Sequence, residues 1–225
     1  MEPFQELSEG LQSLNMPGER IIDRFAVYHD MLLAWNRKIN LISKTDETRI
    51  VRRHFLESIG ILKYMDFPEN ATVLDVGTGG GFPGVPVKLL RHDLSMVLVE
   101  SVGKKVRFLE TVVKELKLTD IRIVAGRIED YNKEIGPADY ALSRAVTDLA
   151  TLAGWCAPCL MPRSGILAVI KGRSADKELQ IFQKQYTELN GLYIEQEVFN
   201  PFPDIHPMEN STLIKVRFFK KHLTH

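Results

Sequence analysis

The sequence predicts an α/β protein built on a parallel β-sheet, with helices at the N-terminus and an antiparallel hairpin at one edge of the sheet. Apolar side chains recur at helical spacing up to residue 64, which predicts helices. After residue 70, short apolar runs alternate with helical segments, as in a parallel sheet covered on both faces. The last two apolar runs are joined by a proline-rich stretch without helical spacing, which predicts the hairpin.

Two amphipathic helices are predicted before the sheet. They cover residues 20–40 and 46–64, where apolar side chains lie three and four residues apart. A cluster of turn-forming residues follows the second helix and ends the helical pattern. We therefore expect a helical cap over residues 1–64 and a second domain over residues 65–225.

Seven strands are expected in the second domain. Each is a run of five to eight residues in which apolar side chains predominate. Helices are expected directly after the first strand, between the second and third, near residue 150, and at 176–190. The predicted strands are 71–76, 95–100, 121–125, 138–143, 165–170, 192–199 and 212–219.

The composition is that of an ordinary globular protein. The chain has 225 residues, of which 44% are hydrophobic, with 29 basic and 29 acidic side chains. Its first residues lack the basic start and apolar run of a secretory signal, and no apolar run approaches the ~20 residues of a membrane-spanning helix. We therefore expect a soluble, cytoplasmic protein without a membrane partner.

The two cysteines, Cys156 and Cys159, form a CxxC pair, which in isolation resembles a redox site. They fall near the end of a predicted helix rather than at its start, and Pro158 and Pro162 close the segment. No nearby CxxC or HxxxH completes a zinc site. We expect structural thiols that are buried or partly buried, and no metal.

The strongest motif is the glycine-rich loop DVGTGGGFPG, which lies between a predicted strand and a predicted helix. Glycine permits positive φ and a close approach of the backbone to a ligand. Gly79, Gly81 and Gly84 fit the dinucleotide pattern GxGxxG. Asp75, Gly77, Gly79 and Gly81 fit the first motif of S-adenosylmethionine-dependent methyltransferases. A structural glycine turn that binds no cofactor is a third interpretation.

Three details favour the methyltransferase. The Asp75 carboxylate precedes the first glycine by two residues, where it can organise the loop around the methionine ammonium. Phe82-Pro83 makes a stiff turn before the helix. A pyrophosphate site, in contrast, normally has a free helix N-terminus with unpaired amide groups. The C-terminal hairpin is the ending typical of methyltransferases. Glu100, at the end of the second strand, suits the ribose hydroxyls of either cofactor. The sequence thus predicts a class I S-adenosylmethionine-dependent methyltransferase with a Rossmann-like sheet, and a nicotinamide-dependent oxidoreductase is the alternative.

Motifs that the sequence lacks exclude some classes of methyl acceptor. Amino-nitrogen methylases carry an (Asp/Asn/Ser)-Pro-Pro-(Tyr/Phe) turn after the fourth strand, where this chain has Ser143-Arg144-Ala145. Cytosine-C5 methylases need a cysteine nucleophile, and Pro158-Cys159 comes about 15 residues too late. A ring nitrogen such as guanine N7 needs neither device, because it has a lone pair and loses no proton. Small-molecule methylation and RNA binding without catalysis are the alternatives.

Several segments together resemble one known family over residues 25–172. In chain order they are WNRKINLISK, RRHFLES, DVGTGGGFPGVP, LVES..KK..FL, RIED, SRAV and KG. They resemble the bacterial 16S ribosomal RNA guanine-N7 methyltransferase family, also called glucose-inhibited division protein B. Glu57 stands where that family usually has Asp, and Ile128 where it often has Ala or Val. The resemblance implies methylation of N7 of a guanine in the 530 loop of 16S rRNA. We expect a monomer that acts on the small (30S) subunit or a late assembly intermediate.

The resemblance also implies roles for individual residues. The glycines and Phe82 would line the methionine and ribose of S-adenosyl-L-methionine, and Ile128 and Glu129 would contact its adenine. Arg144 would face the transferred methyl and the target base. The implied cofactor-binding residues are Asp75, Gly77, Gly79, Gly81, Phe82, Glu100, Ile128, Glu129 and Arg144.

Arg144 is the predicted catalytic residue. Arginine commonly pairs with guanine O6 and N7 together, but here N7 must stay free to attack. We therefore expect the guanidinium to hold O6 or a phosphate, or to stack on the base. An ion pair with Asp139 or Asp148 is the alternative.

RNA contacts are predicted for five further residues. For His54, hydrogen bonding within the helical cap is the favoured interpretation, because an N7 acceptor needs no general base. For Arg127 and Lys171, a solvated side chain is the alternative. The predicted contacts are Arg52, Arg53, His54, Arg127 and Lys171.

The zero net charge hides two oppositely charged stretches. Residues 1–30 carry six acidic and two basic side chains, whereas residues 36–54 carry six basic and two acidic ones. A basic stretch beside a catalytic mouth suits RNA phosphate, and an ordinary solvated helix face is the alternative. Charge therefore does not exclude an RNA substrate recognised largely by its shape.

Overall fold

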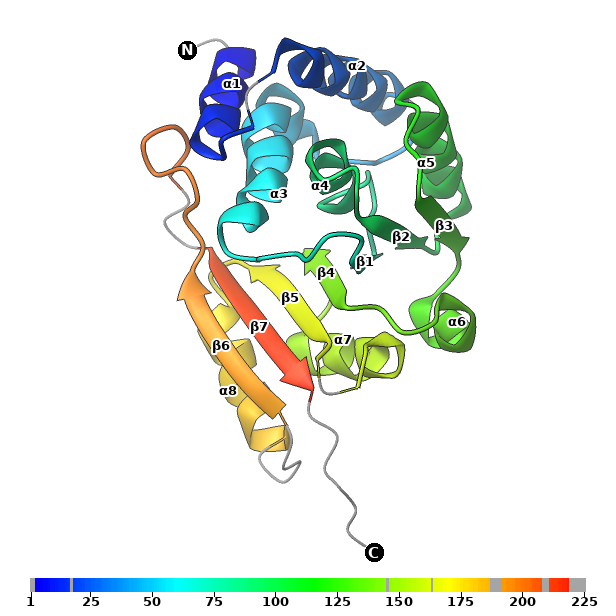
Figure 1. The fold of residues 1–225 in the computed structure, drawn as a ribbon, viewed down its shortest axis with the longest axis vertical. Coiled ribbons are helices and arrows are strands. Elements are labelled where there is room, and N and C mark those ends of the chain that lie inside the picture. Colours follow the sequence, from blue (N-terminus) through cyan, green and yellow to red (C-terminus); the bar gives the residue numbers. More distant parts are fainter. Residues whose placement is uncertain are drawn as a thin grey trace, which may run out of the picture.

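The sheet lies at the centre of the molecule. The computed structural model describes residues 3–16, 18–144, 146–162, 164–186, 192–207 and 211–218. Within these residues seven strands form one sheet, in the order β3-β2-β1-β4-β5-β7-β6 (Figure 1). The predicted strands are confirmed, apart from small shifts at their ends; residue 219 lies outside the described residues. The strands are β1 Thr72–Val76, β2 Ser95–Glu100, β3 Ile121–Ala125, β4 Tyr140–Arg144, β5 Ile166–Lys171, β6 Leu192–Val198 and β7 Thr212–Phe218.

Strands β1 to β5 are parallel, whereas β7 runs antiparallel to both β5 and β6. The predicted hairpin at the sheet edge is therefore confirmed, with β7 on the inside and β6 at the edge. The strand order runs outward from β1 through β2 and β3 on one side, and through β4 and β5 on the other. In open α/β sheets, ligands bind at the carboxyl ends of the strands, where this order reverses.

Helices cover the two faces of the sheet, and alternate strand residues face two separate buried clusters. On one face, Val73 and Leu98 pack in a cluster with α4, α5 and the N-terminal helices. On the other, Leu74 and Val97 pack with α6, α7 and α8. The helices are α1 Pro3–Ser13, α2 Glu19–Asn36, α3 Glu57–Ile59, α4 Gly84–Leu90, α5 Gly103–Glu115, α6 Ile128–Ile135, α7 Leu149–Cys156 and α8 Ala175–Tyr186. None of the helices in these ranges is long and apolar enough to cross a membrane.

The N-terminal helices share their core with the sheet. Leu7 of α1 and Phe25 and Tyr28 of α2 are fully buried in the same cluster as Val73 of β1. Helix α1 is absent from the sequence-based prediction, although Leu7 and Leu11 are spaced for one helical face. The predicted cap therefore shares a buried core with the sheet and packs on α4 and α5; Figure 1 shows α2 and α3 beside α4.

The prediction of one regular helix over residues 46–64 is wrong in detail. The chain forms a 3₁₀ helix at Lys44–Arg49, a π-helix at Val51–Leu56, the short α3, and a second 3₁₀ helix at Gly60–Lys63. π-Helical turns are rare and occur frequently at functional sites. This one carries three of the predicted RNA-contacting residues.

The predicted helix over residues 20–40 ends earlier, at Asn36. Its side-chain Oδ1 accepts hydrogen bonds from the backbone N–H groups of Leu41 (2.8 Å) and Ile42 (3.0 Å). The turn after α2 is thus closed by a side chain that competes with further helical bonds.

Candidate active site

The glycine-rich loop leaves the carboxyl end of β1. Gly77, Gly79 and Gly81 all have positive φ, at 67°, 59° and 97°. The N–H groups of Gly77 and Thr78 both donate to the carbonyl of Val99 in β2, at 3.0 and 3.1 Å. These bonds fix the start of the loop against the neighbouring strand, at the reversal of strand order.

At two of these glycines there is also no space for a side chain. A Cβ on Gly77 would lie 2.5 Å from Cγ2 of Val146, and a Cβ on Gly81 would lie 2.5 Å from the hydroxyl of Tyr28. At Gly79 the nearest atom would be 3.9 Å away, so the backbone conformation is the only constraint there. The loop is therefore held between the segment after β4 and helix α2.

Asp75 holds the glycine loop in place through hydrogen bonds. Its side chain is fully buried, and Oδ2 accepts hydrogen bonds from Thr78 Oγ1 (2.6 Å) and from the N–H of Gly84 (2.7 Å). Within the described residues Oδ1 has no hydrogen-bond partner. Burial raises the pKa of this carboxyl to about 6. An unpaired buried carboxylate oxygen under a positive-φ loop suits a cationic ligand.

A cleft of about 260 Å³ opens beside Gly77, along the carboxyl ends of β1, β2 and β3. Glu100 lies in its wall, where Oε2 accepts from the N–H of Gly79 (3.0 Å) and Oε1 from the N–H of Val102 (2.8 Å). Each carboxylate oxygen keeps acceptor capacity for a further donor, such as a ribose hydroxyl. The cleft is lined by Val76, Gly77, Val99, Glu100, Ser101, Gly126, Arg127, Ile128, Glu129, Val146 and Trp155.

Four of the nine predicted cofactor residues line the cleft: Gly77, Glu100, Ile128 and Glu129. The other five, which do not line it, are Asp75, Gly79, Gly81, Phe82 and Arg144. Ile128 and Glu129 begin α6 and line the same cleft as Gly77, which is consistent with the interpretation of an adenine subsite. Val146 and Trp155 are missing from the sequence-based prediction, because they come from the segment after β4 and from α7, far from the glycine motif. The Glu100 carboxylate as a hydrogen-bond acceptor, the open backbone of the glycine loop and the apolar residues of the cleft lining fit S-adenosylmethionine.

Arg144, the last residue of β4, points from the sheet toward the cap. Its Nη2 lies 2.6 Å from Nδ1 of His54, and its Nη1 donates to the carbonyl of Arg53 (2.7 Å) and to Glu57 Oε2 (3.2 Å). Its guanidinium carbon is 5.3 Å from the ring centre of Phe82. Burial and the neighbouring positive charge of Arg53 lower the pKa of Arg144, which Glu57 opposes.

The two alternative partners offered for Arg144 are engaged elsewhere. Asp139 accepts from the N–H of Thr72 at 2.8 Å, and Asp148 caps α7 by accepting from the N–H of Thr151 at 2.9 Å. The ion pair of Arg144 is instead with Glu57, which the sequence-based prediction does not offer.

His54 is 8% exposed and stacks on Phe82, with ring centres 4.7 Å apart. Burial, and next the positive charge of Arg144, lower the pKa of His54 to about 3. The imidazole is therefore neutral, and Nδ1 accepts the N–H of Arg144. Its hydrogen bond joins it to β4 rather than to the helical cap, and its burial favours an internal role over RNA contact.

The other predicted RNA contacts divide into exposed and internal groups. Arg52 forms a bidentate ion pair with Glu6 of α1, and Arg53 pairs with Glu57 at 2.6 Å, but their side chains remain 46% and 45% exposed. Arg127 is exposed at the rim of the cleft. Lys171 is only 6% exposed, and its ammonium contacts Glu178 and the carbonyl of Thr147. Burial favours an internal role for Lys171.

The prediction of structural thiols is confirmed. Cys156 ends α7, and both cysteine side chains are buried. Burial raises the pKa of the Cys159 thiol to about 11 and that of Cys156 further. Neither thiol has the low pKa of a redox or nucleophilic cysteine.

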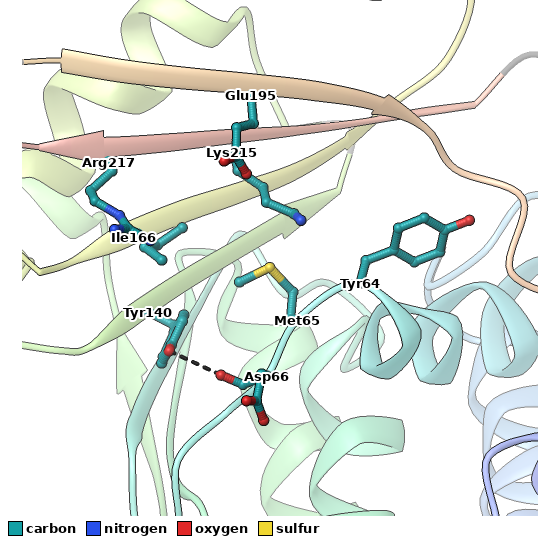
Figure 2. Close-up of a pocket in the computed structure, with 8 residues that line it drawn as sticks. All are labelled: Tyr64, Met65, Asp66, Tyr140, Ile166, Glu195, Lys215 and Arg217. Carbon is teal, nitrogen blue, oxygen red and sulfur yellow. Dashed lines mark hydrogen bonds between the residues drawn. The ribbon is translucent and has the colours of Figure 1, made fainter.

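A second cleft, of about 200 Å³, lies where β4 and β5 begin (Figure 2). Figure 2 shows the hydroxyl of Tyr140 donating to the carbonyl of Asp66, at 3.2 Å. The charges there are mixed, and Lys215 pairs with Glu197 at 2.6 Å. Because this cleft faces the amino ends of the parallel strands and contains none of the predicted residues, the cleft beside Gly77 is the candidate active site.

Comparison with known proteins identifies relatives that match most of the chain. The family model described as rRNA small subunit methyltransferase G matches residues 21–199. A protein of that name from Clostridium botulinum (strain Loch Maree / Type A3) is 34% identical over 219 residues, which cover 96% of this chain and 91% of that protein. Another, from Alkaliphilus metalliredigens (strain QYMF), is 37% identical over 210 residues, which cover 91% and 87%.

Solved structures share the fold. The O-methyltransferase TomG from Streptomyces achromogenes, in complex with SAM, aligns with a TM-score of 0.57 at 10% identity and covers 88% of this chain and 90% of that one. This likeness supports the predicted class I methyltransferase architecture, with its Rossmann-like sheet.

Proposed function

Because the chain belongs to the rRNA small subunit methyltransferase G family, we propose that it transfers a methyl group from S-adenosyl-L-methionine to N7 of a guanine in the 530 loop of 16S rRNA. The family match over residues 21–199 carries this conclusion, since it spans the glycine loop, the cleft and Arg144. The guanine and its position follow from the family resemblance in the sequence.

The surroundings of Arg144 support an acceptor that needs no general base. In the described part of this cluster, the imidazole of His54 already accepts from Arg144, and the Glu57 carboxylate is ion-paired. Neither group is placed to take a proton from an acceptor. Guanine N7 attacks through a lone pair and keeps its proton count unchanged, so positioning supplies most of the catalysis.

We propose that the predicted cofactor residues act as a set. When bound, S-adenosylmethionine supplies an electrophilic methyl group on a sulfonium. Glu100 accepts from the ribose hydroxyls, the start of α6 holds the adenine, and Asp75 offers negative charge beneath the glycine loop. These residues would hold the cofactor so that its methyl group passes to N7 as the sulfur–methyl bond breaks, with S-adenosylhomocysteine as the other product. The proposed set is Asp75, Gly77, Gly79, Gly81, Phe82, Glu100, Ile128, Glu129 and Arg144.

Arg144 is the proposed catalytic residue. Its guanidinium lies between Phe82 of the glycine loop and the π-helix of the cap, and 16% of its side chain is exposed to an incoming base. Holding guanine O6 or a neighbouring phosphate would leave N7 free to attack. Reaching a base edge in structured RNA requires a splayed or flipped nucleotide.

The exposed arginines are the proposed RNA contacts. Arg52, Arg53 and Arg127 present charge at the surface around the cleft and cap. We propose that a monomer acts on 16S rRNA in the 30S subunit or a late assembly intermediate, with residues 1–64 as a helical cap on a methyltransferase domain of residues 65–225. Contacts to phosphate predict affinity that falls steeply with salt.

One experiment tests the function. Small subunits purified from cells that lack the protein are incubated with it and with methyl-labelled S-adenosylmethionine, and the RNA is then cleaved with borohydride and aniline, which reports N7-methylguanine. We expect label in 16S rRNA and one new cleavage in the 530 loop. Subunits from cells that contain the protein are the control. Label without cleavage would contradict the N7 assignment, and no label would contradict the activity.

A further inference from the structure

An ion pair that includes a buried lysine lies at the carboxyl end of β5. Lys171, the last residue of that strand, is 6% exposed, and its Nζ lies 2.8 Å from Glu178 Oε2 on α8. The ammonium also donates to the carbonyl of Thr147, and Glu178 Oε2 accepts from the N–H of Leu149 at 3.2 Å. Glu178 Oε1 accepts from Ser174 Oγ at 2.7 Å, which holds the carboxylate in place. The pair therefore grips the backbone on both sides of residue 148.

The segment of residues 147–149, which the pair holds, is flanked on both sides by parts of the chain that line the candidate active site. Val146, just before it, lines the cleft and packs so closely that a Cβ on Gly77 would lie 2.5 Å from its Cγ2. Asp148, within it, caps α7, and α7 carries Trp155, which also lines the cleft. A shift of residues 147–149 would thus move two of the lining residues at once.

We propose that Lys171 and Glu178 form a positioning pair for the binding of S-adenosylmethionine, acting through residues 146–149. The inference rests on the proposed function, because the ligand is the methyl donor of that reaction. It assigns Lys171 a role other than RNA contact. Its side chain is only 6% exposed and its ammonium directs hydrogen bonds to two oxygens of the protein, so a phosphate would have to displace the charged partner Glu178.

The test compares Lys171→Met with Lys177→Met, which removes the same charge from an exposed position in the first turn of α8. The dissociation constant of S-adenosylmethionine is measured by isothermal calorimetry without RNA, and KM for both substrates is measured with small subunits. We expect Lys171→Met to weaken cofactor binding by roughly tenfold, as for partial loss of a charge-assisted hydrogen bond. KM for the subunit and its salt dependence should stay at the wild-type values, as should all constants of Lys177→Met.

Glu178→Gln and the double variant extend the test. If the two side chains act as one device, the losses in cofactor affinity do not add in Lys171→Met/Glu178→Gln. Val146→Ala keeps the inference testable should the lysine variant fail to fold, because it removes the side chain that the pair holds over Gly77. It too should raise the dissociation constant of the cofactor.

The outcomes are distinct. Unchanged cofactor affinity in a folded Lys171→Met, with a raised KM for the subunit, would overturn the inference in favour of RNA contact. Equal effects of Lys171→Met and Lys177→Met would overturn it in favour of a general charge effect. Wild-type protein that binds no S-adenosylmethionine would instead refute the proposed function.

Discussion

Nδ1 of His54 accepts a hydrogen bond from Nη2 of Arg144 across 2.6 Å, although the two residues are 90 positions apart in the chain. The aromatic ring of Phe82 lies against both, 4.7 Å from the imidazole centre and 5.3 Å from the guanidinium carbon. The π-helix of the cap, the glycine loop and β4 therefore meet at one guanidinium. This contact requires a neutral imidazole, because an imidazolium has no lone pair to accept with.

Arg144→Ala should lower kcat by at least about a hundredfold, as expected when a reactant loses the group that positions it. Cofactor affinity should change far less, since the ribose and adenine walls of the cleft stay intact. Single-turnover methylation and calorimetry measure the two quantities. Arg144→Lys should not restore the rate, because an ammonium cannot bond His54, Glu57 and a base together. Wild-type methylation by Arg144→Ala would contradict the catalytic role.

His54 should make the fold sensitive to acid. Its pKa is lowered from 6.5 to about 3, so the folded state binds fewer protons than the unfolded state between those values, and stability is lost as pH falls through them. From pH 7 to pH 5 this histidine should cost about 2 kcal/mol of unfolding free energy. Urea denaturation of His54→Gln at the two pH values isolates this loss from that of other groups. An identical pH dependence in variant and wild type would refute the burial effect.

Gly77→Ala and Gly79→Ala should separate crowding from backbone strain. Both glycines have positive φ, which costs an L-residue about 1–2 kcal/mol. Only at Gly77 would the new Cβ also meet Val146, at 2.5 Å. We expect the larger loss of unfolding free energy for Gly77→Ala, and partial recovery in Gly77→Ala/Val146→Ala. Urea titrations measure all three variants, and equal losses in the two single variants would count against the contact.

Asp75 should make cofactor binding depend on pH. Its pKa of about 6 means that a proton occupies the carboxyl below that pH, whereas a cationic ligand favours the ionised form. Affinity for S-adenosylmethionine should therefore fall by up to about tenfold from pH 7 to pH 5. Asp75→Asn should bind more weakly at pH 7 and lose this dependence in calorimetry. A flat wild-type profile would argue against Asp75 acting on the ligand charge.

Arg127→Gln should raise KM for the small subunit and reduce its salt dependence. One lost phosphate contact corresponds to a change of about 0.7–0.9 in the slope of log affinity against log salt. Lys133→Gln, at an exposed position on α6, the helix that Arg127 directly precedes, is the matched control. Methylation assays from low to moderate salt measure both slopes, and indistinguishable slopes would leave Arg127 as an ordinary solvated arginine.

The strands are predictable because buried parallel strands appear in a sequence as short, continuous apolar runs. Ser95–Glu100 and Ile121–Ala125 begin and end at the predicted residues. The form of the chain from Lys44 to Lys63 is not predictable, because π and 3₁₀ turns depend on what packs against them rather than on apolar spacing.

The active site divides in the same way. The glycine loop and Asp75 are predictable, because the motif is local and its backbone demands glycine. The partners of Arg144 are not, because His54 reaches it only through the packing of the cap on the sheet, and the two aspartates near it in sequence are used for other bonds. Lys171 illustrates the same limit, since its pairing with Glu178 depends on how α8 returns to the sheet.

The shared core of cap and sheet has a consequence for how the molecule comes apart. Tyr28 of α2 donates its hydroxyl to the carbonyl of Gly80, and Arg24 of the same helix donates to the carbonyl of Leu116 after α5. Detachment of α2 would therefore break the hydrogen bond to the glycine loop and expose the core next to the sheet at the same time. Amide hydrogens of α2 and of β1 should exchange with solvent through one cooperative event. A chain that lacks residues 1–64 would expose this core and would not be a folded enzyme without its cap.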